Sequence, residues 1–219
     1  MGRDENRAVF EDTAKLCKIN PKLNASVQKS VENQKLFLET LVLPKINLTR
    51  YDTPAAVQVS AKRTFEAASA YRGRKTAVHN FASASNPGGG VARGANAQEE
   101  CLCRCSGLYF CLNTGAMWEG FYTPHRSAHN PLHNDDIIYT PEVTVFKTDT
   151  ANPEFMLETD WYNVDIITCA APNLRPKPGN QYNSGDGTEA ALISDLELLK
   201  LHEKRLRRIL DVAVLNGVE

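Results

Sequence analysis

The sequence predicts an α/β fold, in which short buried strands alternate with amphipathic helices. Its 219 residues are 42 % hydrophobic and 23 % charged, an ordinary composition for a folded domain with a sizeable core. Apolar runs at 75–82 and 164–169, bounded by turn residues, are typical of buried strands. Helical periodicity between such runs favours strands packed between helices over an all-α or all-β domain.

The N-terminal part, residues 1–72, is predicted to be a mainly helical extension. Apolar residues at helical spacing predict a helix over 4–18, and a short strand is expected over 36–42. Thr53-Pro54 predicts the start of a helix over 53–71, because threonine caps helices well and proline is tolerated in the first turn.

The remaining residues hold the rest of the predicted sheet and two long helices. Beyond the strand at 75–82, strands are expected at 137–139, 143–146 and 164–169, the first two separated by Pro141. Helices are expected at 95–111 and 188–215, with irregular chain at 116–135 and 173–187. The last helix has an apolar stripe made by Leu192, Leu196, Leu199, Leu206, Leu210 and Ala213.

Charge and cysteine content exclude several classes of protein. Basic residues number 25 and acidic residues 26, so nothing indicates the basic surface of a sequence-specific nucleic-acid binder. A run of about 18 apolar residues, as a membrane span needs, is absent, and the charged N-terminus does not resemble a secretory signal. Four of the six cysteines fall within 101–111 in a predicted helix, which favours reduced thiols and a cytoplasmic location (or a nuclear one in a eukaryote).

A glycine-rich loop, Asn86-Pro87-Gly88-Gly89-Gly90, lies between a predicted strand and a predicted helix. Such loops bind phosphate in many α/β folds, because their backbone N–H groups and the helix N-terminus attract anions. The loop fits neither the dinucleotide fingerprint nor the phosphate-loop template, since Ala95-Asn96 stand where the latter needs Lys and Ser or Thr. By itself the cluster is also a plain turn sequence.

Gln98-Glu99-Glu100 lies near the start of the predicted helix, and seven residues separate it from Gly90. Acidic residues in a first helical turn commonly do no more than complement the helix dipole. Beside three glycines, which let a ligand approach the backbone, two carboxylates also provide a candidate acid and an orienting partner. Shielding from water and a neighbouring carboxylate raise a carboxyl pKa, as a general acid in glycosidic cleavage requires.

Together these residues resemble the Gly-Gly-Gly and Gln-Glu-Glu motif of poly(ADP-ribose) glycohydrolases of the small microbial type, which are built on a macrodomain. The resemblance includes Asn80-Phe81-Ala82 and continues through four later segments: 102–109, 138–143, 166–173 and 205–210. It implies a three-layer α/β/α macrodomain-like fold with a mixed central sheet, and one catalytic domain over residues 1–219.

The resemblance also implies an activity and a role for each motif residue. The chain is expected to cleave the ribose–ribose bond of poly(ADP-ribose), free or on ADP-ribosylated protein, as a monomer without metal or cofactor. Glu100 is expected to protonate the leaving oxygen and then to activate water, and Glu99 to hold ribose hydroxyls. Asn86 is expected to bind a ribose and Gln98 to support the loop. The groups expected to face the diphosphate are Gly88, Gly89, Gly90 and the Val91 amide.

The family pattern continues with a strand and a second glycine-rich loop, and this sequence ends at Glu219 before both. We therefore expect a fragment or a diverged short form without the C-terminal part of the fold. Its leucine stripe and one edge of the sheet are then expected to lie uncovered. Two alternatives stay open, a non-hydrolytic ADP-ribose-binding module and an inactive fragment, although the Glu99-Glu100 pair favours an enzyme.

Four other clusters are expected to be structural. His125, His129 and His133 have the spacing of metal ligands on a helix, but Pro131 interrupts it and favours an exposed loop. The cysteines at 101, 103 and 105 are expected to be buried small side chains. Asp135-Asp136 is expected to start a turn. A basic cluster in the last helix is expected to be a solvated face near the helix C-terminus or a weak aid to binding an anionic polymer: Lys204, Arg205, Arg207 and Arg208.

Overall fold

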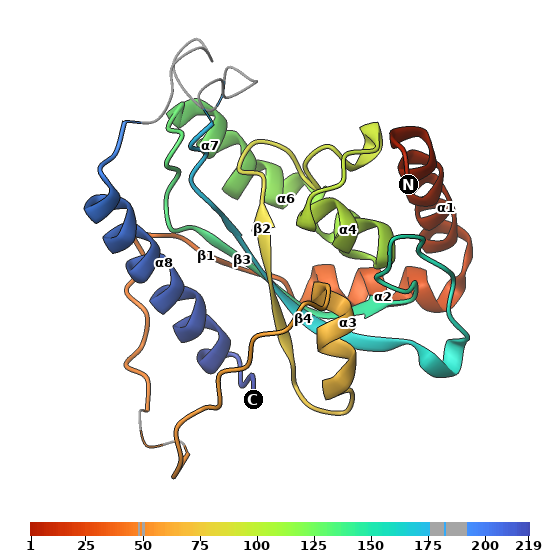
Figure 1. Ribbon diagram of the computed structural model, residues 1–219, viewed down its shortest axis with the longest axis horizontal. Helices are drawn as coiled ribbons and strands as arrows, with labels where there is room; N and C mark the ends of the chain where they lie inside the picture. Colours follow the sequence, from red (N-terminus) through yellow and green to blue (C-terminus); the bar gives the residue numbers. More distant parts are fainter. Residues whose placement is uncertain (48, 50, 176–181, 183–191) are drawn as a thin grey trace.

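A mixed four-stranded sheet forms the centre of the computed structural model, which describes residues 1–47, 49, 51–175, 182 and 192–219 (Figure 1). Its strands are β1 (Lys35–Phe37), β2 (Ala77–Ala82), β3 (Ile137–Val145) and β4 (Tyr162–Ala170), in the order β1-β3-β4-β2. β3 is antiparallel to β1 and β4, whereas β2 and β4 are parallel. The carboxyl ends of β2 and β4 therefore meet at one edge of the sheet.

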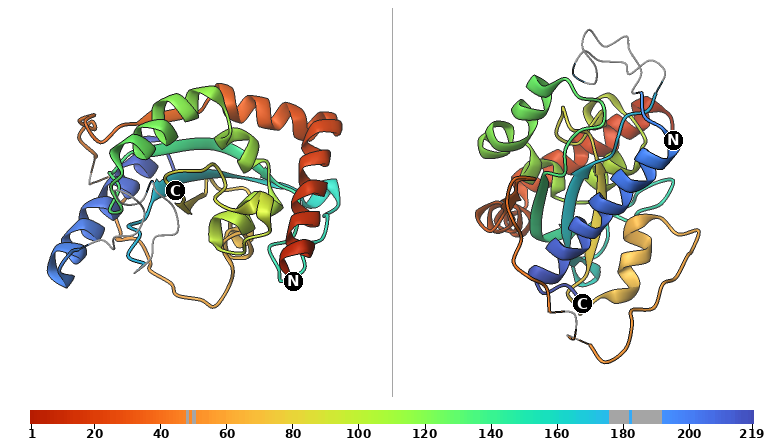
Figure 2. Two further views of the ribbon diagram at one scale, coloured as in Figure 1. Left: turned by 90° about the horizontal axis from the view of Figure 1, so that it is seen from above. Right: turned by 90° about the vertical axis from the view of Figure 1, so that its left-hand side faces the viewer.

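Helices cover both faces of the sheet, which confirms the predicted α/β/α layers. Along β4, Val164 and Ile166 pack into one core, while Ile167 and Cys169 pack into a second, because successive strand side chains point to opposite faces. The first core is covered by α1 (Arg3–Ile19), α3 (Thr64–Ala68), α4 (Gln98–Cys105) and α5 (Leu108–Leu112). The second is covered by α8 (Asp195–Leu215), which runs diagonally across the strands (Figure 2).

The N-terminal extension contains a second helix that the sequence pattern did not predict. The helix predicted over 4–18 is confirmed as α1, and α2 (Pro21–Glu32) follows it directly. Asn20 separates the two, because its side-chain oxygen accepts hydrogen bonds from the backbone N–H groups of Lys22 and Leu23 at 3.0 and 3.2 Å.

The helix predicted over 53–71 is wrong in its first eleven residues, 53–63. α3 begins only at Thr64 and continues into a 3₁₀ turn, Ser69–Tyr71. Val57 and Val59 are more than 90 % exposed, so the apolar residues that suggested a helix in this stretch do not form a buried helix face. The helix starts where the Glu66 carboxylate can accept the Arg63 N–H at 3.2 Å.

The helix predicted over 95–111 is two helices, α4 and α5, with a 3₁₀ turn (Val91–Arg93) ahead of them. The break lies at Ser106, which forms a β-bridge with Val145. The Cys105 carbonyl accepts from the N–H groups of Phe146 and Lys147 instead of continuing the helix. A tertiary contact with the end of β3 therefore overrides the local helical pattern.

The stretch 116–135, predicted to be irregular, is helical in its first half. It forms α6 (Gly115–Met117), a π-helical turn (Trp118–Tyr122) and α7 (Thr123–Ala128). The exposed-loop prediction is therefore wrong for His125, which is 4 % exposed, and for His133, which is half-buried. His129 is exposed as expected.

Two predicted strands at 137–139 and 143–146 are one bulged strand, β3. The register shifts between Thr140 and Val143, and Glu142 takes a left-handed φ of 52°. The bulge is held because the Glu142 N–H donates to the Asp165 carboxylate at 2.9 Å. β1 ends at Phe37, five residues before the predicted end of that strand. Ahead of β4, the chain forms a 3₁₀ turn, Glu158–Asp160.

The last helix, α8, begins at Asp195, where the Ser194 hydroxyl accepts the Glu197 N–H at 3.3 Å. Residues 188–191 of the predicted helix, and most of the loop predicted over 173–187, lie outside the described residues. The leucine stripe is uncovered as expected, with exposures of 51–64 % at Leu196, Leu199, Leu206 and Leu210. Phe81, on the edge strand β2, is 57 % exposed. In the described ranges, no helix is long and apolar enough to cross a bilayer.

Arg205 and Asp135 fix α8 to the sheet, which corrects the solvated basic face for Arg205 and corrects the Asp135-Asp136 turn, whereas Lys204 and Arg207 are exposed as expected. Arg205 is 4 % exposed, and its Nε donates to Asp135 Oδ1 at 2.7 Å. Its Nη1 donates to the carbonyl of Ala170, the last residue of β4, at 2.8 Å. Burial opposes ionisation of Asp135, but the bonds from Lys204 and Arg205 prevail and lower its pKa. The cluster also lies in mid-helix, away from the C-terminus.

Replacing Arg205 by methionine is expected to lower the free energy of unfolding by about 3 kcal/mol, because it leaves the buried Asp135 carboxylate with Lys204 as its one remaining ion-pair partner among the described residues. Urea denaturation measures the change. Arg207→Met is the matched control, since Arg207 is exposed on the same helix and its replacement is expected to change stability by less than about 0.5 kcal/mol. Equal denaturation midpoints for the two variants would contradict the anchoring role.

Candidate active site

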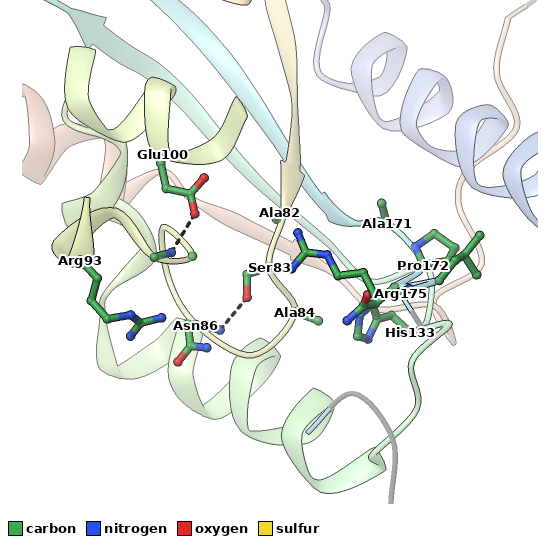
Figure 3. Close-up of a pocket in the computed structure, with 14 residues that line it drawn as sticks. Ala82, Ser83, Ala84, Asn86, Arg93, Glu100, His133, Ala171, Pro172 and Arg175 are labelled. Carbon is green, nitrogen blue, oxygen red and sulfur yellow. Dashed lines mark hydrogen bonds between the residues drawn. The ribbon is translucent and has the colours of Figure 1, made fainter. Parts of the chain in front are cut away.

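A cavity of about 530 Å³ opens at the carboxyl ends of β2 and β4 (Figure 3). Ala82 and Ser83, at the end of β2, lie between its two walls. One wall comes from the glycine loop and α4: Asn86, Gly89, Gly90, Arg93 and Glu100. The other comes from the segments before β3 and after β4: His133, Pro172, Asn173 and Arg175. The fold thus joins three distant segments around one space, at the edge of the sheet where α/β proteins commonly bind ligands.

The glycine loop is compact and uses its own N–H groups. Gly88 and Gly89 take left-handed φ values of 64° and 58°, which favour glycine. The Gly89 N–H donates to the Asn86 carbonyl at 3.0 Å, and the Val91 N–H to the Gly88 carbonyl at 3.1 Å. The predicted contacts of these amides with a diphosphate stay a prediction, and in this state both N–H groups are bonded within the loop.

Glu100 is held by backbone donors at the wall of the cavity. It is the third residue of α4 and is 7 % exposed. Its Oε1 accepts the Gly90 N–H at 2.8 Å, and its Oε2 accepts the Ala97 N–H at 3.0 Å. The second bond is half of a capping box, since Ala97 has no side-chain oxygen for the other half. The carboxylate is therefore fixed between the loop and the start of its own helix.

Glu99 lies behind the loop, outside the lining of the cavity. It is 3 % exposed and accepts hydrogen bonds from the Ser83 N–H at 2.8 Å and the Asn80 amide at 3.4 Å. Burial raises the pKa of Glu99 to about 8, although both bonds act in the opposite direction. The carboxyl is then mostly protonated at neutral pH, and its predicted contact with ribose hydroxyls stays a prediction.

The raised pKa of Glu99 makes stability depend on pH. The folded state keeps the proton up to about pH 8, whereas the unfolded chain releases it near pH 4.5, so stability falls as pH rises between these values. Glu99→Gln cannot ionise, and its stability relative to the wild type is expected to rise by more than about 1 kcal/mol from pH 5 to pH 8. Urea denaturation at both pH values measures this. Glu119→Gln, at an exposed site, is expected to show no such trend, and the same flat result for Glu99→Gln would contradict a neutral Glu99.

The other predicted residues divide between the cavity wall and its support. Gln98 pairs with the edge of β2, because its Oε1 accepts the Phe81 N–H at 2.9 Å and its Nε2 donates to the His79 carbonyl at 2.7 Å. Gly88 and Val91 are buried behind the wall. Of the predicted set, the structure places four in the cavity lining: Asn86, Gly89, Gly90 and Glu100.

Among the cavity residues that the sequence did not predict, three carry a basic side chain: Arg93, His133 and Arg175. Arg175 extends from the segment after β4 across the cavity toward Ser83, while Arg93 lies on the glycine-loop side (Figure 3). The two guanidinium groups make the cavity suitable for an anion. Burial lowers the pKa of His133 to about 4, so this imidazole is neutral at pH 7. The sequence could have indicated Arg175 as a binding residue, because it closely follows the carboxyl end of the strand predicted at 164–169, where α/β proteins commonly bind ligands.

The described residues hold no group of three or more histidine, cysteine or acidic side chains that could hold a metal ion. All six cysteines are free thiols. Cys103 and Cys105 are fully buried, which confirms the structural interpretation for these two, whereas Cys101 is half-buried.

Comparisons with known proteins point to one family. The family model described as the catalytic domain of microbial-type PARG matches residues 11–148. The crystal structure of poly(ADP-ribose) glycohydrolase (PARG) from Thermomonospora curvata is 29 % identical with a TM-score of 0.74, over 97 % of this chain and 76 % of that one. A second structure of that enzyme, bound to the inhibitor ADP-HPD, gives the same values. PARG from Deinococcus radiodurans in complex with ADP-ribose is 29 % identical with a TM-score of 0.63, over 88 % of this chain and 72 % of that one. No curated protein matches the chain.

Proposed function

The chain belongs to the microbial-type PARG catalytic domain family, and we propose that it hydrolyses the ribose–ribose O-glycosidic bond of poly(ADP-ribose) with Glu100 as the general acid and base. The observation that carries this proposal is the buried Glu100 carboxylate, which lines a cavity beside two glycines and two arginines. A carboxyl group next to a site for an anionic ligand is what acid-assisted cleavage of a phosphate-bearing sugar needs.

The proposed reaction breaks the bond between the anomeric carbon of one ribose and the oxygen of the next. Protonated Glu100 gives its proton to that oxygen as the bond breaks, and positive charge develops on the anomeric carbon. The Glu100 carboxylate then takes a proton from water as the water oxygen bonds to the same carbon. The net change is the addition of one water molecule, and Glu100 ends in its starting protonation state.

Orientation of the substrate is proposed to depend on both walls of the cavity. The diphosphate of an ADP-ribose unit carries two negative charges, and Arg93 and Arg175 provide positive charge from opposite sides. Gly89 and Gly90 present no side chain, so a ribose can approach the Glu100 carboxylate closely. Fixed orientation of this kind contributes to the rate in addition to the proton transfer.

Incubation of the chain with poly(ADP-ribose), followed by chromatography of the products, tests the proposal. Release of ADP-ribose is the expected result. Calorimetric titration with ADP-ribose in the same buffer separates the alternatives. Binding without release would instead indicate an ADP-ribose-binding module, and the absence of both would overturn the assignment of this cavity.

A further inference from the structure

The side-chain amide of Asn86 is held in one orientation at the cavity wall. Its Oδ1 accepts a hydrogen bond from Arg126 Nη2 at 2.7 Å, and its Nδ2 donates to Ser85 Oγ at 3.1 Å. A guanidinium group has donors only, so the amide atom that faces it must be the oxygen. This contact therefore fixes which end of the amide is oxygen and which is nitrogen.

Arg126 is itself fixed on several sides. It lies on α7, and its Nε donates to the Ser85 carbonyl at 2.7 Å. Its guanidinium group lies 4.5 Å from the ring centroid of Trp118 and 4.6 Å from that of Tyr182. The guanidinium group thus donates hydrogen bonds to two consecutive loop residues, Ser85 and Asn86, while the rings of Trp118 and Tyr182 pack against it. A lysine in its place could not make both hydrogen bonds with this geometry.

We propose that Arg126 is a positioning residue that makes Asn86 a hydrogen-bond donor toward the substrate. Arg126 donates to the Asn86 oxygen, and one of the two Nδ2 hydrogens is donated to Ser85. Among the described residues the other Nδ2 hydrogen has no acceptor, and Asn86 lines the cavity, so a bound ligand can accept it. Asn86 then recognises an acceptor oxygen of an ADP-ribose unit, such as a ribose or phosphate oxygen. This inference rests on the proposed function.

Asn86→Asp removes the donor. Measuring the affinity loss at low and at high salt separates this effect from repulsion between the new carboxylate and the diphosphate, because salt screens the repulsion but does not restore the donor. The aspartate keeps the size of the side chain and its contact with Arg126, but it offers no N–H group. ADP-ribose affinity and KM for poly(ADP-ribose) are expected to worsen at least about tenfold, with the thermal midpoint unchanged and kcat within about threefold. Asn163→Asp makes the same charge change at an exposed position near the start of β4 and is expected to leave both values unchanged.

Arg126→Lys tests whether Arg126 acts through Asn86. Alone it is expected to weaken ADP-ribose binding about three- to tenfold, and added to Asn86→Asp it is expected to weaken binding no further. If the affinity losses of the two single variants multiply in the double variant, Arg126 acts independently of Asn86 and the proposal is overturned. Wild-type affinity in Asn86→Asp would overturn it as well. All four affinities are measured by calorimetry on the Glu100→Gln background, so binding of ADP-ribose is tested even if the chain releases none. A chain that binds ADP-ribose without releasing it would contradict the proposed function alone.

Discussion

Replacing Glu100 by glutamine is expected to lower the rate of ADP-ribose release from poly(ADP-ribose) by about 10²–10⁴-fold. The amide N–H groups are too weakly acidic to protonate the leaving oxygen, and the amide is too weak a base to take a proton from water. Its volume matches that of the carboxyl, so the cavity keeps its shape. One of the two backbone N–H groups, from Gly90 or Ala97, loses its acceptor, which costs about 1–2 kcal/mol of stability.

Single-turnover release of ADP-ribose measures this effect, together with calorimetric binding of ADP-ribose to the same variant. Binding is expected to stay within about tenfold of the wild-type value. Glu119→Gln is the matched control, because it makes the same chemical change at an exposed position. If Glu100→Gln releases ADP-ribose as fast as this control, another group supplies the proton and the role of Glu100 is wrong.

Replacing Gly89 by alanine is expected to lower activity about a hundredfold or more. A Cβ atom there would lie 2.5 Å from Glu100 Oε1 and 3.0 Å from Glu99 Oε2. Two backbone bonds fix the Glu100 carboxylate, so relief of the contact requires the acid to move. A displacement of about 1 Å at a reacting group costs on the order of 10²-fold in rate. The φ of 58° at Gly89 adds about 1–2 kcal/mol of backbone strain.

Gly73→Ala separates backbone strain from contact with the carboxylates. Gly73 has a φ of 87°, and nothing lies within 4 Å of a Cβ built there. Replacing Gly73 by alanine is expected to lower the free energy of unfolding by about as much as the backbone strain in Gly89→Ala, and to leave activity unchanged. Thermal midpoints and release rates of both variants make the comparison. Wild-type activity in Gly89→Ala would show that the loop does not control the position of Glu100.

Some helices and strands were predictable from the sequence, because the apolar pattern that produces them involves only residues close together in the chain. The helix over 4–18 and the strands at 75–82 and 164–169 have periodic apolar patterns, and the structure contains all three. Boundaries that depend on distant partners were not predictable. The break at Ser106 depends on pairing with Val145, and the late start of α3 depends on which segments find a packed surface.

The division of roles between Glu99 and Glu100 also needed the structure. Adjacent residues of a helix point about 100° apart, so only one of the two could face the cavity. The sequence indicated the pair, and packing of the glycine loop against α4 decided that Glu100 lines the cavity while Glu99 lies buried beneath Gly89. The raised pKa expected for one carboxyl belongs to Glu99, because burial is deepest there.

The strand, the glycine loop and the acidic helix start were predictable as one unit from the amino-acid sequence, because a hydrogen bond between residues ten apart needs only local chain geometry. The residues that complete the site come from distant parts of the chain, and the packing of the fold selects them. Arg126 meets Asn86 from forty residues away, and Arg205 meets Asp135 from seventy. The charges and donors of such residues are visible in the sequence, but their partners are set by how the sheet and helices pack, because packing brings distant residues within hydrogen-bonding distance.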